Sequence, residues 1–231
     1  MNTAIILAGG LGTRLRSITK DALPKPMVIV QGYPFLHWQM RYLKKQGIKK
    51  VIMAVSHHAE MIQDFFQTEY LSIPICYSVE KKPLGTGGGI AQAMQLTNDP
   101  SVVISNGDTY FPVDLKKLQS EHKKSKNDIT IAIKLMFNFD RYGTVDVNKD
   151  NRINAFNEKK FRQKAYINGG TYIINQSVFS DDYSGQAFSI EKEIFSQKIN
   201  TLRIGACKYK SGFIDIGIPE EYVHIQTMHL K

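Results

Sequence analysis

Cysteine is scarce in this sequence, and long apolar runs are absent. The 231 residues include two cysteines, Cys76 and Cys207, and each lies in an apolar segment typical of a strand. We therefore expect two buried free thiols rather than a disulfide or a metal site. No apolar run approaches the length of a membrane span, and the N-terminus carries no basic leader. The sequence thus predicts a cytoplasmic protein without a membrane segment.

Linkers and repeats are also missing from the chain. There is no Ser/Gly-rich or Pro-rich tract, no like-charge run of disordered length and no internal repeat. Hydrophobic residues make up 42% of the chain and charged residues 22%, which is typical of an ordinary globular protein. We predict a single domain over 1–231, and the sequence leaves open whether it forms a homo-oligomer.

Acidic residues are outnumbered, so the formal net charge is +9. The lysines occur in scattered pairs, such as Lys44–Lys45 and Lys123–Lys124, with no aromatic residues interleaved. Such pairs are typical of solvated faces rather than of a nucleic-acid interface. A positive charge also attracts anionic substrates. The alternative, a basic nucleic-acid or nucleotide-binding module, predicts salt-sensitive binding of polynucleotides.

The segment 5–26 combines an apolar strand, a glycine-rich turn and two cations. Gly9, Gly10 and Gly12 lack the Cβ that would keep a phosphate away from backbone amides. Arg14 offers a planar guanidinium to phosphate oxygens, whereas Lys25 is a point charge held between two prolines. The segment therefore predicts a phosphate site, although the glycines alone would equally fit a tight turn.

Two familiar glycine motifs do not match this segment. A P-loop requires a Lys-Ser or Lys-Thr pair after the glycines, and none follows them. A dinucleotide fingerprint that starts at Gly10 requires a further glycine where Leu15 stands.

Strand-like and helix-like segments alternate through the first half of the chain. Residues 50–55 and 73–79 read as buried strands, with a helix at 59–66 between them. This rhythm favours a parallel sheet. A second glycine loop, 80–89, is expected between a strand and a helix over 90–96. In open α/β sheets, loops of this kind form the ligand crevice.

An aspartate follows the next predicted strand, 101–105. Asp108 would sit at the carboxyl end of that strand, beside the phosphate loop. Mg²⁺ prefers a few carboxylates together with substrate phosphates, so Asp108 is a candidate Mg²⁺ ligand.

The motif set resembles that of a known enzyme family. Leu-Ala-Gly-Gly-x-Gly-Thr-Arg-Leu at 7–15, followed by Pro-Lys-Pro at 24–26, closely resembles the signature of the sugar-1-phosphate nucleotidyltransferases. Further similarity covers essentially 3–223. The resemblance implies an α/β protein with a Rossmann-like three-layer α/β/α fold and a mixed, mostly parallel central sheet. It also implies Mg²⁺ as cofactor, with a nucleoside triphosphate and a sugar 1-phosphate as substrates.

The same resemblance assigns roles to individual residues. Catalysis would depend on Arg14, Lys25, Asp108, Lys159 and Asp215, of which Asp108 and Asp215 would bind the metal. The nucleotide would be bound by Leu7, Ala8, Gly9, Gly10, Gly12, Thr13, Arg14, Lys25, Glu80, Pro83, Gly85, Thr86, Asn106 and Gly107. The sugar phosphate would be bound by Tyr142, Gly143, Glu158, Lys159, Asn168 and Gly169.

Within the family, the motifs most resemble guanylyltransferases that act on heptose 1-phosphate, with those acting on mannose 1-phosphate next. GTP is therefore the expected donor. The carboxylate of Glu80 could accept the two adjacent N–H donors of guanine, unless it merely faces solvent beside Lys81 and Lys82. A metal-dependent glycosyltransferase is disfavoured because the chain has no Asp-x-Asp.

Overall fold

The computed structural model describes residues 2–10, 23–179, 183 and 185–230. Its centre is a ten-stranded mixed sheet with the strand order β11-β10-β12-β7-β1-β4-β6-β5. Strand β9 pairs with β12 and also with β13. The four central strands β7, β1, β4 and β6 are parallel, as the alternation of strands and helices predicted. The prediction of a mixed sheet with a parallel centre is therefore confirmed.

The strands of the described chain are β1 (Thr3–Leu7), β2 (Ile29–Val30), β3 (Tyr33–Pro34), β4 (Lys50–Val55), β5 (Glu69–Tyr70), β6 (Ile73–Val79), β7 (Ser101–Asn106), β8 (Thr109–Tyr110), β9 (Ile129–Phe139), β10 (Thr144–Val147), β11 (Ile153–Asn157), β12 (Arg162–Asn175), β13 (Ile204–Tyr209) and β14 (Ile214–Asp215). The α-helices are α2 (Phe35–Lys45), α3 (Ala59–Phe66), α4 (Gly85–Met94), α5 (Leu115–Lys124) and α6 (Pro219–Ile225). Short 3₁₀ segments are η2 (Lys25–Met27) and η3 (Gln176–Val178), and η5 (Ile190–Ser196) is a π-helix.

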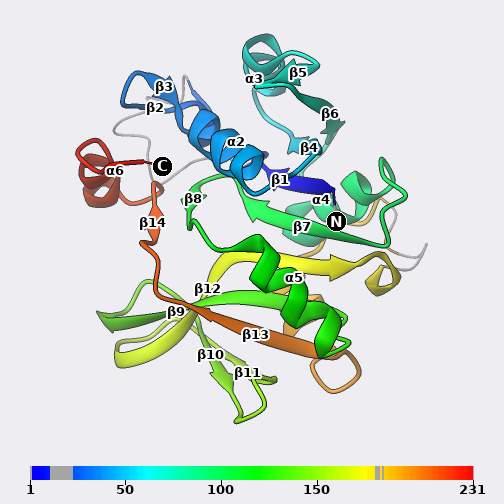
Figure 1. The fold of residues 1–231 in the computed structure, drawn as a ribbon, viewed down its shortest axis with the longest axis vertical. Coiled ribbons are helices and arrows are strands. Elements are labelled where there is room, and N and C mark those ends of the chain that lie inside the picture. The colour runs from blue at the N-terminus through cyan, green and yellow to red at the C-terminus, as the bar shows by residue number, and fades with distance from the viewer. Residues whose placement is uncertain (1, 11–22, 180–182, 184, 231) are drawn as a thin grey trace.

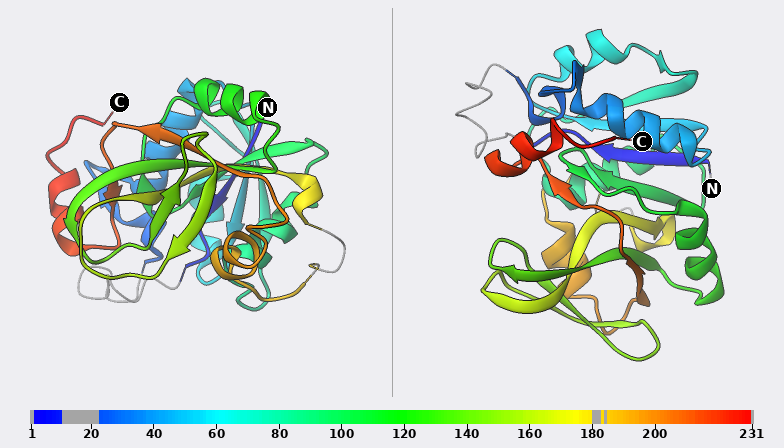
Figure 2. Two further views of the ribbon diagram at one scale, coloured as in Figure 1. Left: turned by 90° about the horizontal axis from the view of Figure 1, so that it is seen from below. Right: turned by 60° about the vertical axis from the view of Figure 1, so that its left-hand side comes forward.

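The central strands are buried on both faces, which makes the fold three-layered. Along β1, Ala4 and Ile6 join one hydrophobic cluster, whereas Ile5 joins the other, because successive side chains point to opposite faces. Helices α2, α3 and α5 contribute to the first cluster, and α4 and η5 to the second. The antiparallel strands β9 to β12 lie below the parallel strands in Figure 1 and in the right view of Figure 2.

Several local predictions agree closely with these elements. Asp114 caps α5 by accepting a hydrogen bond from the amide of Lys117, and Pro219 occupies the first turn of α6. The predicted loop over 80–89 was wrong in its second half, because α4 begins at Gly85 and residues 85–89 form its first turns. Cys207 is buried as expected, whereas Cys76 is only partly buried.

No helix in the described ranges is both long enough and apolar enough to cross a membrane.

Phe195 is the residue we select to test the second cluster. It is fully buried, stacks on Phe156 at 5.3 Å between ring centroids and meets Tyr172 edge-on at 5.5 Å. Phe195→Ala should lower the free energy of unfolding by about 3–5 kcal/mol, because it removes buried surface and leaves a cavity. Phe161, which is 68% exposed, supplies the control. Phe161→Ala should change stability by less than about 0.5 kcal/mol in the same urea titration, and equal losses would contradict this packing.

Candidate active site

A cavity of about 380 Å³ opens where β1, β4 and β7 end. Parallel strands present their carboxyl ends at one edge of a sheet, and ligands of such sheets bind there. Most residues of the predicted nucleotide site line this cavity. The lining comprises Leu7, Gly9, Gly10, Lys25, Pro26, Ala54, Glu80, Pro83, Gly85, Thr86, Asn106, Gly107 and Asp108.

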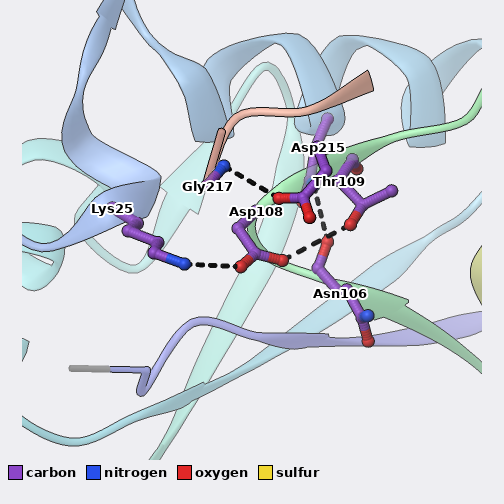
Figure 3. Close-up of polar contacts among 7 residues, drawn as sticks. Lys25, Asn106, Asp108, Thr109, Asp215 and Gly217 are labelled. Carbon is purple, nitrogen blue, oxygen red and sulfur yellow. Dashed lines mark hydrogen bonds and ion pairs between the residues drawn. The ribbon is translucent and has the colours of Figure 1, made fainter. Parts of the chain in front are cut away.

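The charge at the base of the cavity comes from Lys25 and Asp108. Lys25 opens η2 between two prolines, and only 7% of the residue is exposed. Its Nζ lies 3.2 Å from Asp108 Oδ2, as Figure 3 shows. Asp108 lies in the two-residue turn between β7 and β8, so the end of a central strand delivers it to this place. Its side chain is 31% exposed, so the carboxylate can still contact a group bound in the cavity.

Asp215 reaches the same place from the far end of the chain. Strand β14 pairs antiparallel with β8, and this register places Asp215 opposite Thr109. The next residue, Ile216, donates its amide to the carbonyl of Asp108 at 3.0 Å. Asp215 is 8% exposed, and its Oδ1 accepts a hydrogen bond from the amide of Gly217 at 2.8 Å. The two aspartates predicted from distant motifs are thus brought together by backbone pairing (Figure 3).

Position 217 requires a glycine because two charged groups lie against it. A Cβ at this position would lie 2.7 Å from Asp215 Oδ1 and 2.8 Å from Lys25 Nζ. The ammonium of Lys25 therefore approaches both carboxylates. Two carboxylates and one ammonium leave a net negative charge, which suits a divalent cation that also takes phosphate oxygens. The described residues contain no group of three or more His, Cys, Asp or Glu side chains arranged to hold a metal.

Glu80 is not a solvated surface residue. Its Oε2 accepts a hydrogen bond from the amide of Leu84 at 3.0 Å, and a Cβ added at Gly89 would lie 2.7 Å from its Oε1. Burial raises the pKa of the Glu80 carboxyl, and the Leu84 hydrogen bond partly opposes this shift. Glu80 therefore belongs to the cavity wall, and its carboxylate is only partly exposed to solvent.

The segment 186–191 packs directly on the glycines that begin α4. The carbonyl of Phe188 accepts a hydrogen bond from the amide of Gly87 at 2.9 Å, and a side chain at Gly87 would overlap the Phe188 ring. Thr86 Oγ1 donates to Glu191 Oε2 at 2.8 Å and accepts from the amide of Ile190 at 3.0 Å. These glycines therefore allow two chain segments to approach closely, and they hold the cavity wall in place.

The predicted sugar-phosphate residues do not line the cavity. Glu158 and Lys159 are exposed on the chain between β11 and β12. The Tyr142 ring meets that of Phe213 edge-on at 5.5 Å. Asn168 Oδ1 accepts a hydrogen bond from the amide of Gly170, whose α-carbon packs against the Asn106 side chain.

The remaining predicted residues lie in several different places. Gly143 lies close to the carbonyl of Asn157, and Gly169 is buried against the Phe111 ring. Ala8 is buried and does not line the cavity, and its amide donates to the carbonyl of Ala54 at 2.8 Å. The predicted residues Gly12, Thr13 and Arg14 lie outside the described ranges.

Sequence reasoning missed three residues at this site. Pro26 and Ala54 line the cavity, and Gln39 donates hydrogen bonds to the turn that bears Asp108. The sequence indicates Pro26 only as a restraint on the backbone of Lys25. Gln39 is a polar residue within an apolar helical pattern, which is a detectable signal, but the pattern does not reveal what it contacts.

Comparison with known proteins places these features in context. The family model described as "Nucleotidyl transferase" matches residues 3–231. The chain is 47% identical over 221 residues to a D-glycero-alpha-D-manno-heptose 1-phosphate guanylyltransferase of Campylobacter jejuni, which covers 96% of this chain and 97% of that protein. It is 45% identical to an enzyme of the same description from Aneurinibacillus thermoaerophilus, covering 95% of this chain and 94% of that protein.

A solved structure shares both fold and sequence with the chain. HddC from Yersinia pseudotuberculosis, solved in complex with GMP-PN, superposes with a TM-score of 0.88 at 36% identity, and the match covers 98% of each chain.

The crowding at Gly217 generates a prediction that needs no ligand. Gly217→Ala should lower the free energy of unfolding by about 1–3 kcal/mol, because the added methyl group must displace Asp215 or Lys25. Gly212→Ala is the control, since a Cβ there would meet only Met228 Cε, at 3.7 Å. Urea unfolding of both variants measures the difference. A Gly217→Ala protein as stable as the control would show that the two charged groups do not lie there.

Proposed function

The chain belongs to the nucleotidyl transferase family, and we propose that it transfers a guanylyl group from GTP to D-glycero-α-D-manno-heptose 1-phosphate. The products are GDP-heptose and pyrophosphate. The relatives at 47% and 45% identity, matched over nearly their whole length, support the choice of substrates. The observation that carries the chemistry is the placement of Lys25, Asp108 and Asp215 together at the base of the strand-end cavity.

The reaction is an in-line attack at phosphorus. An oxygen of the sugar phosphate attacks the α-phosphorus of GTP, and pyrophosphate leaves with the electrons of the broken P–O bond. A phosphate monoester has its second pKa at about 6, so the nucleophile is already mostly dianionic at neutral pH. A general base is therefore unnecessary. Catalysis then consists of aligning the two substrates and compensating their negative charge.

The residues of this chain divide that task. Lys25 faces the cavity and would neutralise charge on the triphosphate, together with Arg14. Lys159 would bind the incoming sugar phosphate, and Tyr142, Gly143, Glu158, Asn168 and Gly169 would hold the sugar. Leu7, Ala8, Gly9, Gly10, Gly12, Thr13, Glu80, Pro83, Gly85, Thr86, Asn106 and Gly107 would bind the nucleotide.

The family depends in general on a divalent metal, and we take Mg²⁺ as the metal of this chain. The partly exposed Asp108 and the buried Asp215 fit its preference for a few carboxylates combined with phosphate oxygens. When bound there, the metal would supply charge neutralisation to the phosphates of the donor.

A substrate panel tests the proposal. GTP, ATP, UTP, CTP and dTTP are each combined with the 1-phosphates of manno-heptose, mannose and glucose, and pyrophosphate release is measured. GTP with heptose 1-phosphate should have the highest kcat/KM. A higher kcat/KM with mannose 1-phosphate would make mannose 1-phosphate the acceptor instead. The absence of pyrophosphate release from every pair would reject the enzyme assignment.

Two lysines should affect different kinetic parameters. Lys25→Ala should lower kcat with every acceptor, because the charge it supplies acts on the donor. Lys159→Ala should chiefly raise the KM for sugar phosphate, by about 10- to 100-fold, the usual worth of a hydrogen bond to a charged group. Lys160→Ala, at the exposed neighbouring position, is the control. Unchanged sugar-phosphate kinetics in the Lys159 variant would mean that the acceptor site is misplaced.

Glu80 offers a test of base choice. Guanine presents two adjacent N–H donors to a carboxylate, whereas uracil presents one donor between two carbonyl oxygens. Glu80→Gln keeps an oxygen for the amide of Leu84 and supplies an N–H₂ group to a pyrimidine. The ratio of kcat/KM for GTP to that for UTP should fall by the equivalent of roughly 1–3 kcal/mol. Glu60→Gln, on a side chain that is 70% exposed, is the control. An unchanged ratio would exclude Glu80 from base recognition.

A further inference from the structure

Gln39 is a buried polar residue in the middle of α2, and 2% of it is exposed. Its side-chain Nε2 donates to the carbonyl of Asn106 at 2.7 Å and to the carbonyl of Thr109 at 2.8 Å. These two carbonyls flank the turn that contains Asp108. One amide group therefore uses both of its protons to tie the two ends of this turn to the helix.

Apolar packing alone does not explain a glutamine here. The buried face of α2 is otherwise largely apolar, with Leu36 and Met40 both fully buried. Burying an amide costs free energy unless all of its polar atoms find partners. Gln39 Oε1 is buried and has no hydrogen-bond partner in the part of the chain that the structure describes. An aliphatic side chain would avoid that cost but would take the Nε2 donor away from the carbonyls of Asn106 and Thr109, so the pair of donated hydrogen bonds is the distinctive contribution of Gln39.

The turn is held from three directions. The amide of Gly107 donates to the carbonyl of Leu7 at 2.8 Å, and the amide of Ile216 donates to the carbonyl of Asp108 at 3.0 Å. The first of these bonds reaches β1 of the central sheet, and the second comes from the residue that follows β14. Gln39 supplies the third restraint from the covering helix, and it acts on the residues before and after Gly107 and Asp108.

We propose that Gln39 is a positioning residue that fixes the Asp108 carboxylate beside Lys25 for nucleotidyl transfer. The role in catalysis rests on the function proposed above, whereas the role in holding the turn does not. Without the two donated hydrogen bonds, the turn can shift while the strands on either side stay paired. A displaced carboxylate would then stand in the wrong place for the charge that develops during transfer.

A pair of matched variants tests this role. Gln39→Met preserves the length of the side chain and removes both donors. Gln46→Met makes the same change on the end of the same helix, where Gln46 Oε1 accepts from the amide of Leu115 at 2.9 Å and so holds the start of α5. The first measurement is hydrogen–deuterium exchange at residues 107–109 in the protein without substrates. Gln39→Met should speed exchange there by about tenfold, and Gln46→Met should leave it unchanged.

The second measurement is steady-state kinetics. Gln39→Met should lower kcat by about 10- to 100-fold with the KM for GTP within threefold of wild type, and should raise the Mg²⁺ concentration for half-maximal rate. Gln46→Met should keep kcat within twofold. Wild-type exchange at 107–109, or a kcat within twofold of wild type despite faster exchange, would overturn the proposal.

A second variant of Gln39, with a shorter amide side chain, completes the test. Gln39→Asn keeps an N–H₂ group but cannot reach both carbonyls, so it should show the same pattern with smaller changes. Loss of the folded state in both Gln39 variants would assign the residue to general stability and overturn the positioning role. If the substrate panel detects no transfer, the proposed function fails, but the exchange measurement still decides whether Gln39 holds the turn.

Discussion

The contact between Lys25 and Asp108, with Asp215 alongside, is the interaction on which the rest of this site depends. Like charges repel strongly when they are partly buried, so two adjacent carboxylates require a nearby cation. Lys25 provides that cation from a proline-bounded 3₁₀ turn that leaves its backbone little freedom. Because three segments from the beginning, middle and end of the chain each contribute one charged group, the site exists only when the whole fold is assembled.

Close backbone approach is what lets these segments meet. Gly107 lies against the carbonyl of Leu7, and Gly217 lies against both Asp215 and Lys25. Glycine is required at these positions by contact distance rather than by an unusual backbone angle. The same principle applies to the glycines at the start of α4, where Gly87 and Gly88 leave room for the segment 186–188. A substitution at any of these positions would separate segments that the site needs side by side.

The cavity wall is stiffened by side chains that recognise backbone groups. Glu80 accepts from the amide of Leu84, and Gln39 donates to the carbonyls of Asn106 and Thr109. Thr86 connects α4 to the π-helix η5 through Glu191 and the amide of Ile190. Buried polar contacts of this kind fix position more than they add net stability, because each replaces a hydrogen bond to water. Their concentration around one cavity is consistent with a site that must align two charged substrates.

The sequence by itself determined the strands of the parallel core, because apolar runs with turn signals between them depend only on local spacing. It also predicted Lys25 and Asp108 as site residues from recognisable motifs, and both line the cavity. Only the tertiary structure decided that the glycines at 85–89 are helical, because the segment 186–188 that packs on them is distant in sequence. It alone decided the contacts of Gln39, since a period of 3.6 residues places a side chain on a face without naming its partner.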